Sequence, residues 1–215
     1  ILDMEESLKP DAPKIWTEVV RFQPTSKEPN RYITREGETG DVQKGFSEAD
    51  KVLGRKDGAV GRLIFNNPEK RNAISIDMSL AAADIIEDFG NDPAIRVIVL
   101  SGAGDKAFVS GGDISKFEGQ RSTPEQIAEY DRKRQRFRSV LHDVGKPTIA
   151  MIRGYCLGGG MAIALNCDMR FCSEDAKFGV PAARLSIGYA AEGLAQLLAL
   201  TGPALAKQIM FTGAR

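Results

Sequence analysis

Two glycine clusters, each placed after a short apolar run, carry the clearest chemical potential in this 215-residue sequence. Gly111-Gly112-Asp113 follows Phe108-Val109, and Gly158-Gly159-Gly160 follows Tyr155-Cys156-Leu157. Where a strand ends and a helix begins, backbone N–H groups remain unpaired at the positive end of the helix dipole. Because glycine has no Cβ, a ligand can approach these groups closely. Two of them pointing at one oxygen would form an oxyanion hole, and the alternative is tight packing without a ligand.

Other catalytic groups are scarce in the sequence. The single histidine, His142, falls on the polar face of a predicted helix, which favours a solvated side chain. Cys156, Cys167 and Cys172 have neither CxxC spacing nor a second histidine beside them, so no metal site is predicted. We interpret them as buried, reduced thiols of a cytoplasmic protein. Gly102-Ala103-Gly104 resembles a dinucleotide fingerprint, but an apolar run rather than a helix follows it.

Charge and composition narrow the class of partner. Lys and Arg together number 29 and Asp and Glu also 29, so the formal net charge is 0, which argues against nucleic-acid binding. The sequence shows no apolar run of roughly 18 residues, so no membrane helix and no membrane partner are predicted. Residues 1–50, punctuated by prolines, are predicted to be an irregular N-terminal extension, and residues 51–215 a core domain.

Strands that alternate with helices predict an α/β fold with mainly parallel pairing for this core. Residues 52–65 are expected to form a hairpin with its turn at Asp57-Gly58. Later strands are expected at 95–100, 148–152 and 169–172. Helices are expected at 75–90, 123–145, 194–200 and 204–210, the last two divided by Gly202-Pro203.

A series of short motifs runs in order through the same domain: NPEKRNAI at 67–74, KAFVSGGDI at 106–114, KPTIA at 146–150, GYCLGGG at 154–160, CD at 167–168 and FGVP at 178–181. Together they resemble the motifs of the crotonase (enoyl-CoA hydratase/isomerase) superfamily. The resemblance implies a ββα spiral with helices on the outside, whose C-terminal helices are absent from this sequence. It also implies a homotrimer or dimer of trimers that binds acyl-CoA thioesters, with coenzyme A as part of the substrate and no separate cofactor.

The resemblance further implies the residues of the site. The oxyanion hole would consist of the N–H groups of Gly112 and Gly159, which stabilise a thioester enolate. Lys70 and Arg71 would meet the CoA phosphates or else remain solvated. Asp113 is expected to cap backbone N–H groups rather than act as a base. The residues expected to bind substrate are Lys70, Arg71, Ala73, Ser110, Asp113, Ile114, Leu157, Ala162, Pro181 and Ala182.

The sequence departs from the family at its acid–base positions. Hydratases of the family carry one Glu two positions after the glycine triplet and another after the Pro of FGxP, where this sequence has Ala162 and Ala182. A third position, used by some isomerases, falls at Ala190. Alanine can neither take a proton from water nor deliver one to carbon. Tyr189 and Glu192 are candidate catalytic replacements, although a carboxylate that opens a helix often faces solvent.

Three hypotheses for function follow from this departure. The first is an acyl-CoA enzyme of the enoyl-CoA hydratase/isomerase type, a lyase or isomerase of fatty acid metabolism. The second is a decarboxylase that acts on a malonyl-type CoA thioester, where loss of CO₂ leaves an enolate and no strong base is needed. The third is a non-catalytic acyl-CoA-binding scaffold. The glycine clusters are retained in this sequence, so all three hypotheses include binding of a thioester.

Overall fold

A computed structural model describes residues 42–43, 51–113 and 123–213 of the chain. Apart from the short strand β1 (Val42–Gln43), the expectation of an irregular extension at 1–50 lies outside the described residues. The expected substrate contact of Ile114 lies outside them as well.

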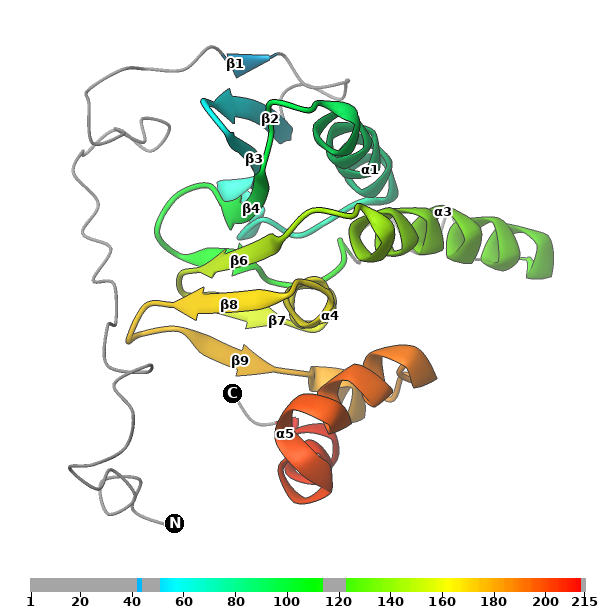
Figure 1. Ribbon diagram of the computed structural model, residues 1–215. Helices are drawn as coiled ribbons and strands as arrows, with labels where there is room; N and C mark the ends of the chain where they lie inside the picture. Colours follow the sequence, from blue (N-terminus) through cyan, green and yellow to red (C-terminus); the bar gives the residue numbers. More distant parts are fainter. Residues whose placement is uncertain (1–41, 44–50, 114–122, 214–215) are drawn as a thin grey trace, which may run out of the picture.

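The larger sheet contains the predicted hairpin and continues as parallel strands (Figure 1). Its order is β1, β2, β3, β4, β6, β8, and the pairs from β3 onward are parallel. The predicted α/β class, the hairpin and the strands at 148–152 and 169–172 are therefore confirmed. The remaining bounds are β2 Val52–Asp57, β3 Val60–Phe65, β4 Val97–Gly102, β6 Thr148–Ile152 and β8 Met169–Cys172.

A second, smaller sheet was not expected from the sequence. It consists of β5 (Ala107–Val109), β7 (Tyr155–Leu157) and β9 (Lys177–Gly179), in the order β5, β7, β9 and parallel throughout. The runs ahead of the two glycine clusters, now β5 and β7, were expected as strand ends, whereas β9 was not expected. Three residues are too few for alternation of apolar and polar residues to indicate which strands pair into a sheet.

The helices begin at the residues that their capping side chains predict. Ser75 Oγ accepts a hydrogen bond from Met78 N (3.2 Å) ahead of α1, and Thr123 Oγ1 accepts one from Gln126 N (3.3 Å) ahead of α3. The helices are α1 Ile76–Asn91, α3 Pro124–Asp143, α4 Gly159–Asn166 and α5 Ala191–Thr212, with 3₁₀ turns η2 at Pro68–Lys70 and η4 at Pro181–Leu185.

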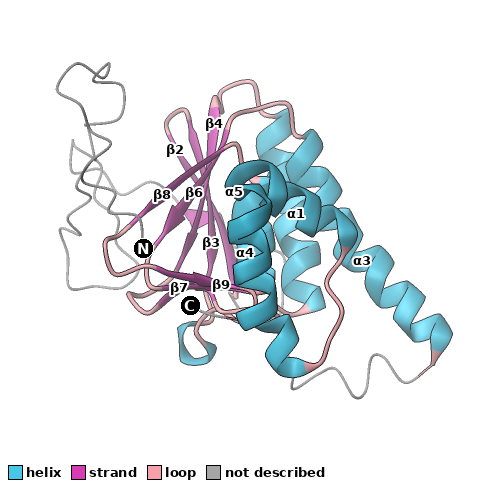
Figure 2. Cartoon of the chain, turned by 90° about the horizontal axis from the view of Figure 1, so that it is seen from below, coloured by secondary structure: helices cyan, strands magenta, loops and turns pink. Residues whose placement is uncertain are grey.

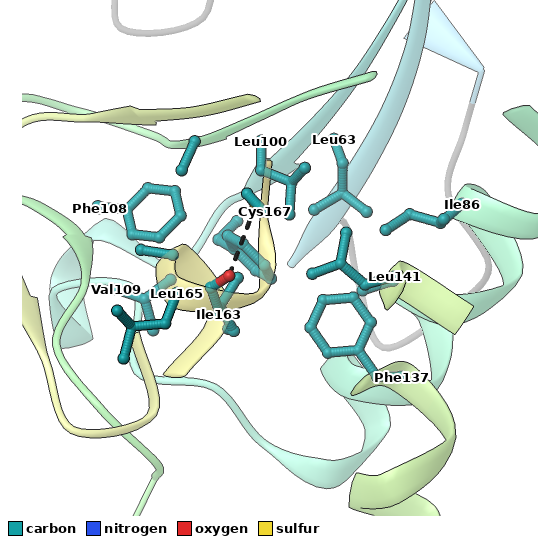
Figure 3. Close-up of a cluster of buried hydrophobic side chains, with 14 of the residues drawn as sticks. Leu63, Ile86, Leu100, Phe108, Val109, Phe137, Leu141, Ile163, Leu165 and Cys167 are labelled. Atoms are coloured by element: carbon teal, nitrogen blue, oxygen red, sulfur yellow. Dashed lines mark hydrogen bonds between the residues drawn. The ribbon is translucent and has the colours of Figure 1, made fainter. Parts of the chain in front are cut away.

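The helices gather on one side of the strands, and their apolar faces build the core there (Figure 2). Leu63 and Leu100 of the larger sheet point toward Ile86 of α1 and Phe137 of α3 (Figure 3). Phe65 contacts Phe137 edge to face, with ring centroids 6.3 Å apart, and Phe108 of the smaller sheet in the same way at 6.0 Å. The core therefore joins both sheets to α1 and α3.

Helix α5 is a long apolar helix with a break in its backbone. Gly202 (φ 71°, ψ 168°) interrupts it beside Pro203, which confirms the predicted division into two helical pieces. By length and composition alone α5 would suffice to cross a membrane, with a mean hydropathy of 1.2 over an 18-residue window, and the expectation of no membrane partner stays a prediction. Its large apolar side chains that are exposed are Leu198, Leu200, Leu205 and Phe211.

Candidate active site

The two glycine clusters meet at one edge of the smaller sheet. β5 and β7 are parallel neighbours, so their carboxyl ends lie side by side. The glycines follow β7 directly and β5 after one residue, Ser110. A Cβ placed on Gly159 would lie 3.5 Å from Gly112 N, which shows how closely the two turns approach.

The N–H groups of Gly112 and Gly159 are both left without an acceptor in the described part of the chain. Gly159 is the first residue of α4, where an N–H has no partner within the helix. The first bond of that turn is donated instead by Ala162 N to Gly158 O (3.0 Å). Two closely spaced amides that can each donate a hydrogen bond are the requirement for an oxyanion hole.

Close packing of α4 on β5 produces this arrangement. A Cβ on Gly160 would lie 2.0 Å from Val109 O, so only glycine lets the start of α4 approach the end of β5. Gly158 turns the chain with a positive φ of 51°. Opposite this turn, Pro181 Cδ lies 3.9 Å from where a Gly158 Cβ would be, so η4 also borders the site.

The loop of residues 67–74, between β3 and α1, lies along the Gly112 turn. Lys70 Nζ donates to Asp113 Oδ2 (2.9 Å), so the two side chains form an ion pair. The expected phosphate contact of Lys70 and the expected backbone cap by Asp113 stay predictions. Ser110 Oγ donates to Lys70 O (3.3 Å), and the Ala73 carbonyl accepts from an Asn67 side chain (3.3 Å). The guanidinium of Arg71 lies 5.4 Å from the Tyr155 ring centroid.

The two alanines that replace the family's glutamates lie on the elements that border the glycine turns. Ala162 is half-buried in the first turn of α4, and Ala182 is buried in η4, one residue after Pro181. Leu157, the last residue of β7, is buried as well. The surroundings of the two amides therefore present methyl groups at these positions rather than carboxylates.

Tyr189 and Glu192 take different environments. The Tyr189 hydroxyl is buried and has no hydrogen-bond partner in the described part of the chain. Burial raises its pKa, and the guanidinium groups of Arg134 and Arg138 act in the opposite direction. The Glu192 carboxylate is 66% exposed and lies 3.7 Å from Arg138, so it takes the solvent-facing alternative.

The histidine and the cysteines show no sign of a catalytic role beside the two glycine turns. His142 is exposed, as expected. Cys156 and Cys167 are buried and desolvation raises the pKa of each to about 12, so they stay protonated, whereas Cys172 is exposed and its predicted burial is wrong. Within the described ranges, no three His, Cys, Asp or Glu side chains are close enough to hold a metal ion.

One residue of evident importance at this site was not singled out from the sequence. Asn72 is fully buried, and its side chain joins the 67–74 loop to the ends of β4 and β5. The available signal was an amide side chain within a turn, since Asn tolerates the left-handed conformation that it adopts here (φ 55°).

The α/β fold with two sheets and two facing glycine turns agrees with the crotonase-like architecture that the sequence motifs imply. The sequence profile of the family "Enoyl-CoA hydratase/isomerase" matches residues 55–215, and the chain belongs to this family. The expected superfamily is thereby confirmed.

Individual relatives support the same assignment. The chain is 32% identical over 163 residues to the crotonyl-CoA hydratase of Syntrophomonas wolfei, covering 76% of this chain and 62% of that protein. It is 36% identical over 165 residues to the short-chain-enoyl-CoA hydratase of Clostridium acetobutylicum, covering 77% and 62%. The chain therefore spans less than two thirds of the length of these relatives.

Solved structures agree in fold. An enoyl-CoA hydratase/carnithine racemase from Magnetospirillum magneticum superposes with a TM-score of 0.73 at 35% identity, covering 77% of this chain and 62% of that one. An enoyl-CoA hydratase subunit from Geobacillus kaustophilus gives a TM-score of 0.71 at 35% identity, covering 79% and 64%. The crotonase-like fold class expected from the sequence is confirmed.

Proposed function

We propose that this protein is an acyl-CoA enzyme that stabilises a thioester enolate with the backbone N–H groups of Gly112 and Gly159. The single observation that carries this proposal is the close approach of two amides that have no acceptor among the described residues. Hydrogen bonds from fixed amides strengthen as negative charge develops on an oxygen, so they favour the enolate over the thioester. Coenzyme A belongs to the substrate in this proposal, and the assembly is a homotrimer or a dimer of trimers.

The surroundings of the amides support chemistry that does not need the usual pair of glutamates. Ala162 and Ala182 can neither accept nor donate a proton, so water addition to a double bond has no acid–base pair at these positions. The two amides still stabilise an enolate, however it is generated. The reaction is therefore defined by the oxyanion hole and not by the family's acid–base pair.

Decarboxylation of a malonyl-type thioester is the second candidate, favoured by Tyr189. The bond between the α carbon and the carboxylate would break, CO₂ would leave, and the electron pair would remain on the enolate until water protonates the α carbon. A buried hydroxyl with an unused hydrogen bond, in the positive field of Arg134 and Arg138, is suited to orient a carboxylate.

Calorimetric titration of the purified protein tests the binding step. We expect butyryl-CoA and malonyl-CoA to bind more tightly than free CoA, because only they carry a thioester carbonyl oxygen for the two backbone amides. The variant Gly159→Ala should weaken acyl-CoA binding about tenfold, equivalent to about 1.4 kcal/mol, since its methyl would lie 3.5 Å from Gly112 N.

Gly188→Ala is the matched control, because no heavy atom lies within 4 Å of a Cβ there. Its affinities should equal those of the wild type. A flat titration with every acyl-CoA would contradict the proposal. Binding without turnover of enoyl, malonyl or other acyl thioesters would instead identify the scaffold.

A further inference from the structure

Asn72 occupies the centre of the 67–74 loop and is unusual among its polar residues. Its side chain is 0% exposed, and its backbone is left-handed, with φ 55°. A buried amide needs partners for its N–H and carbonyl groups, since an unmet hydrogen bond in the interior costs roughly 1–3 kcal/mol. The structure supplies these partners from two different parts of the fold.

The partners of Asn72 are all backbone groups. Its Nδ2 donates to Ala103 O (3.0 Å) and to Ala107 O (2.8 Å), and its Oδ1 accepts from Asn67 N (2.9 Å). Ala103 follows β4 in the larger sheet and Ala107 begins β5 in the smaller sheet. One side chain therefore connects the loop to both sheets.

Gly102, the last residue of β4, leaves space for the Asn72 side-chain amide because it has no Cβ. A Cβ there would lie 2.7 Å from Asn72 Nδ2 and 2.3 Å from the carbonyl oxygens of Ala107 and Phe108. No other residue type fits without moving the backbone. The space for Asn72 is thus built into the strand as well as into the loop.

The backbone on either side of Asn72 holds the turn that carries Gly112. Ser110 N donates to Arg71 O (3.1 Å), Ile74 N donates to Gly111 O (2.9 Å), and Asp113 N donates to Ile74 O (2.9 Å). The Gly111 carbonyl and the Gly112 N–H belong to one planar peptide group, so the bond from Ile74 N holds that group directly, while the bond donated by Asp113 N holds the next one. The Gly112 N–H itself has no acceptor among the described residues. The direction of the Gly112 N–H therefore depends on where the loop lies.

We propose that Asn72 is a positioning residue for the oxyanion hole, which sets the direction of the Gly112 N–H by holding residues 71–74 against both sheets. This inference rests on the proposed function. An N–H group that is held in place polarises the carbonyl to which it donates. An N–H group that can shift by about 1 Å loses much of this polarisation. Asn72 touches no reacting atom in this proposal and acts through Gly112 alone.

The test uses butyryl-CoA labelled with ¹³C at its thioester carbonyl. Infrared difference spectra of the bound ligand report how strongly the carbonyl is polarised, which a purely structural residue elsewhere would not alter. We expect a shift to lower frequency in the wild type. Asn72→Gly tolerates the left-handed backbone but lacks the amide, and should lose most of this shift and about tenfold in butyryl-CoA affinity, with free CoA affinity unchanged within about twofold.

Asn72→Asp is the second variant, because it keeps the acceptor oxygen and removes the two N–H donations. It should lose the shift as well. Asn67→Ala is the matched control, since it removes only the bond to Ala73 O in the same loop and should keep the wild-type spectrum. Circular dichroism and thermal unfolding establish that each variant is folded.

The outcomes separate the two proposals. A wild-type shift that persists in folded Asn72→Gly or Asn72→Asp would overturn the role of Asn72 and leave the proposed function standing. Loss of the fold in both variants would also overturn it, because the effect would then be general rather than local. A wild type that binds butyryl-CoA without any shift would overturn the oxyanion hole itself.

Discussion

Gly160→Ala is expected to lower the free energy of unfolding by about 3 kcal/mol and to abolish acyl-CoA binding. The added methyl would lie 2.0 Å from Val109 O and 2.9 Å from Val109 Cβ, so α4 has to move away from β5. Since this contact brings the Gly159 turn next to the Gly112 turn, the two amides would separate. Urea unfolding and calorimetric titration with butyryl-CoA measure the two effects.

Two other glycine-to-alanine substitutions serve as comparisons for Gly160→Ala. Gly188→Ala should leave both stability and binding unchanged, and Gly159→Ala should leave stability nearly unchanged, because its Cβ makes contacts of 3.5 Å or more. If Gly160→Ala is as stable as Gly188→Ala and binds butyryl-CoA normally, the close approach of α4 to β5 is not what forms the site.

Hydration of crotonyl-CoA by the wild-type protein should be at least about 10⁴-fold slower than by the short-chain-enoyl-CoA hydratase of Clostridium acetobutylicum assayed beside it. Each acid or base in such a reaction contributes roughly 10²–10⁴-fold, and Ala162 and Ala182 contribute neither. The loss of absorbance of the enoyl thioester measures the rate directly.

Tyr189→Phe and Glu192→Gln are the informative variants for that assay. If the wild type hydrates crotonyl-CoA at a rate near that of the relative, and either variant removes the activity, an acid–base pair has moved to the start of α5. Hydration near the relative's rate that neither variant changes would equally contradict the expectation. His142→Ala serves as the control, because His142 is exposed on α3.

The larger sheet and its helices could be predicted from the sequence because their signals are local. Short, mainly apolar segments predicted β6 and β8 with their observed bounds, and Ser75 and Thr123 predicted where α1 and α3 begin. The smaller sheet could not be predicted in this way. Its strands of three residues exist because they pair with one another across 22 to 48 residues of sequence, as in Ala107 with Tyr155 and Tyr155 with Lys177.

The candidate site, too, could be predicted only where its signals are local in the sequence. The two glycine turns were visible in the sequence, since a strand that ends in glycines before a helix leaves free amides. The partners of the charged side chains were not, because Lys70 meets Asp113 and Glu192 meets Arg138 only after the loops are placed by the fold. Asn72 went unnoticed for the same reason, since its acceptors lie 31 and 35 residues further along the chain.

A crystal structure of the protein with bound acetyl-CoA tests the proposed oxyanion hole most directly. We predict that the thioester oxygen lies about 3 Å from both Gly112 N and Gly159 N, in line with each N–H. A thioester oxygen that is hydrogen-bonded elsewhere, with both amides turned away from it or bonded within the protein, would contradict it.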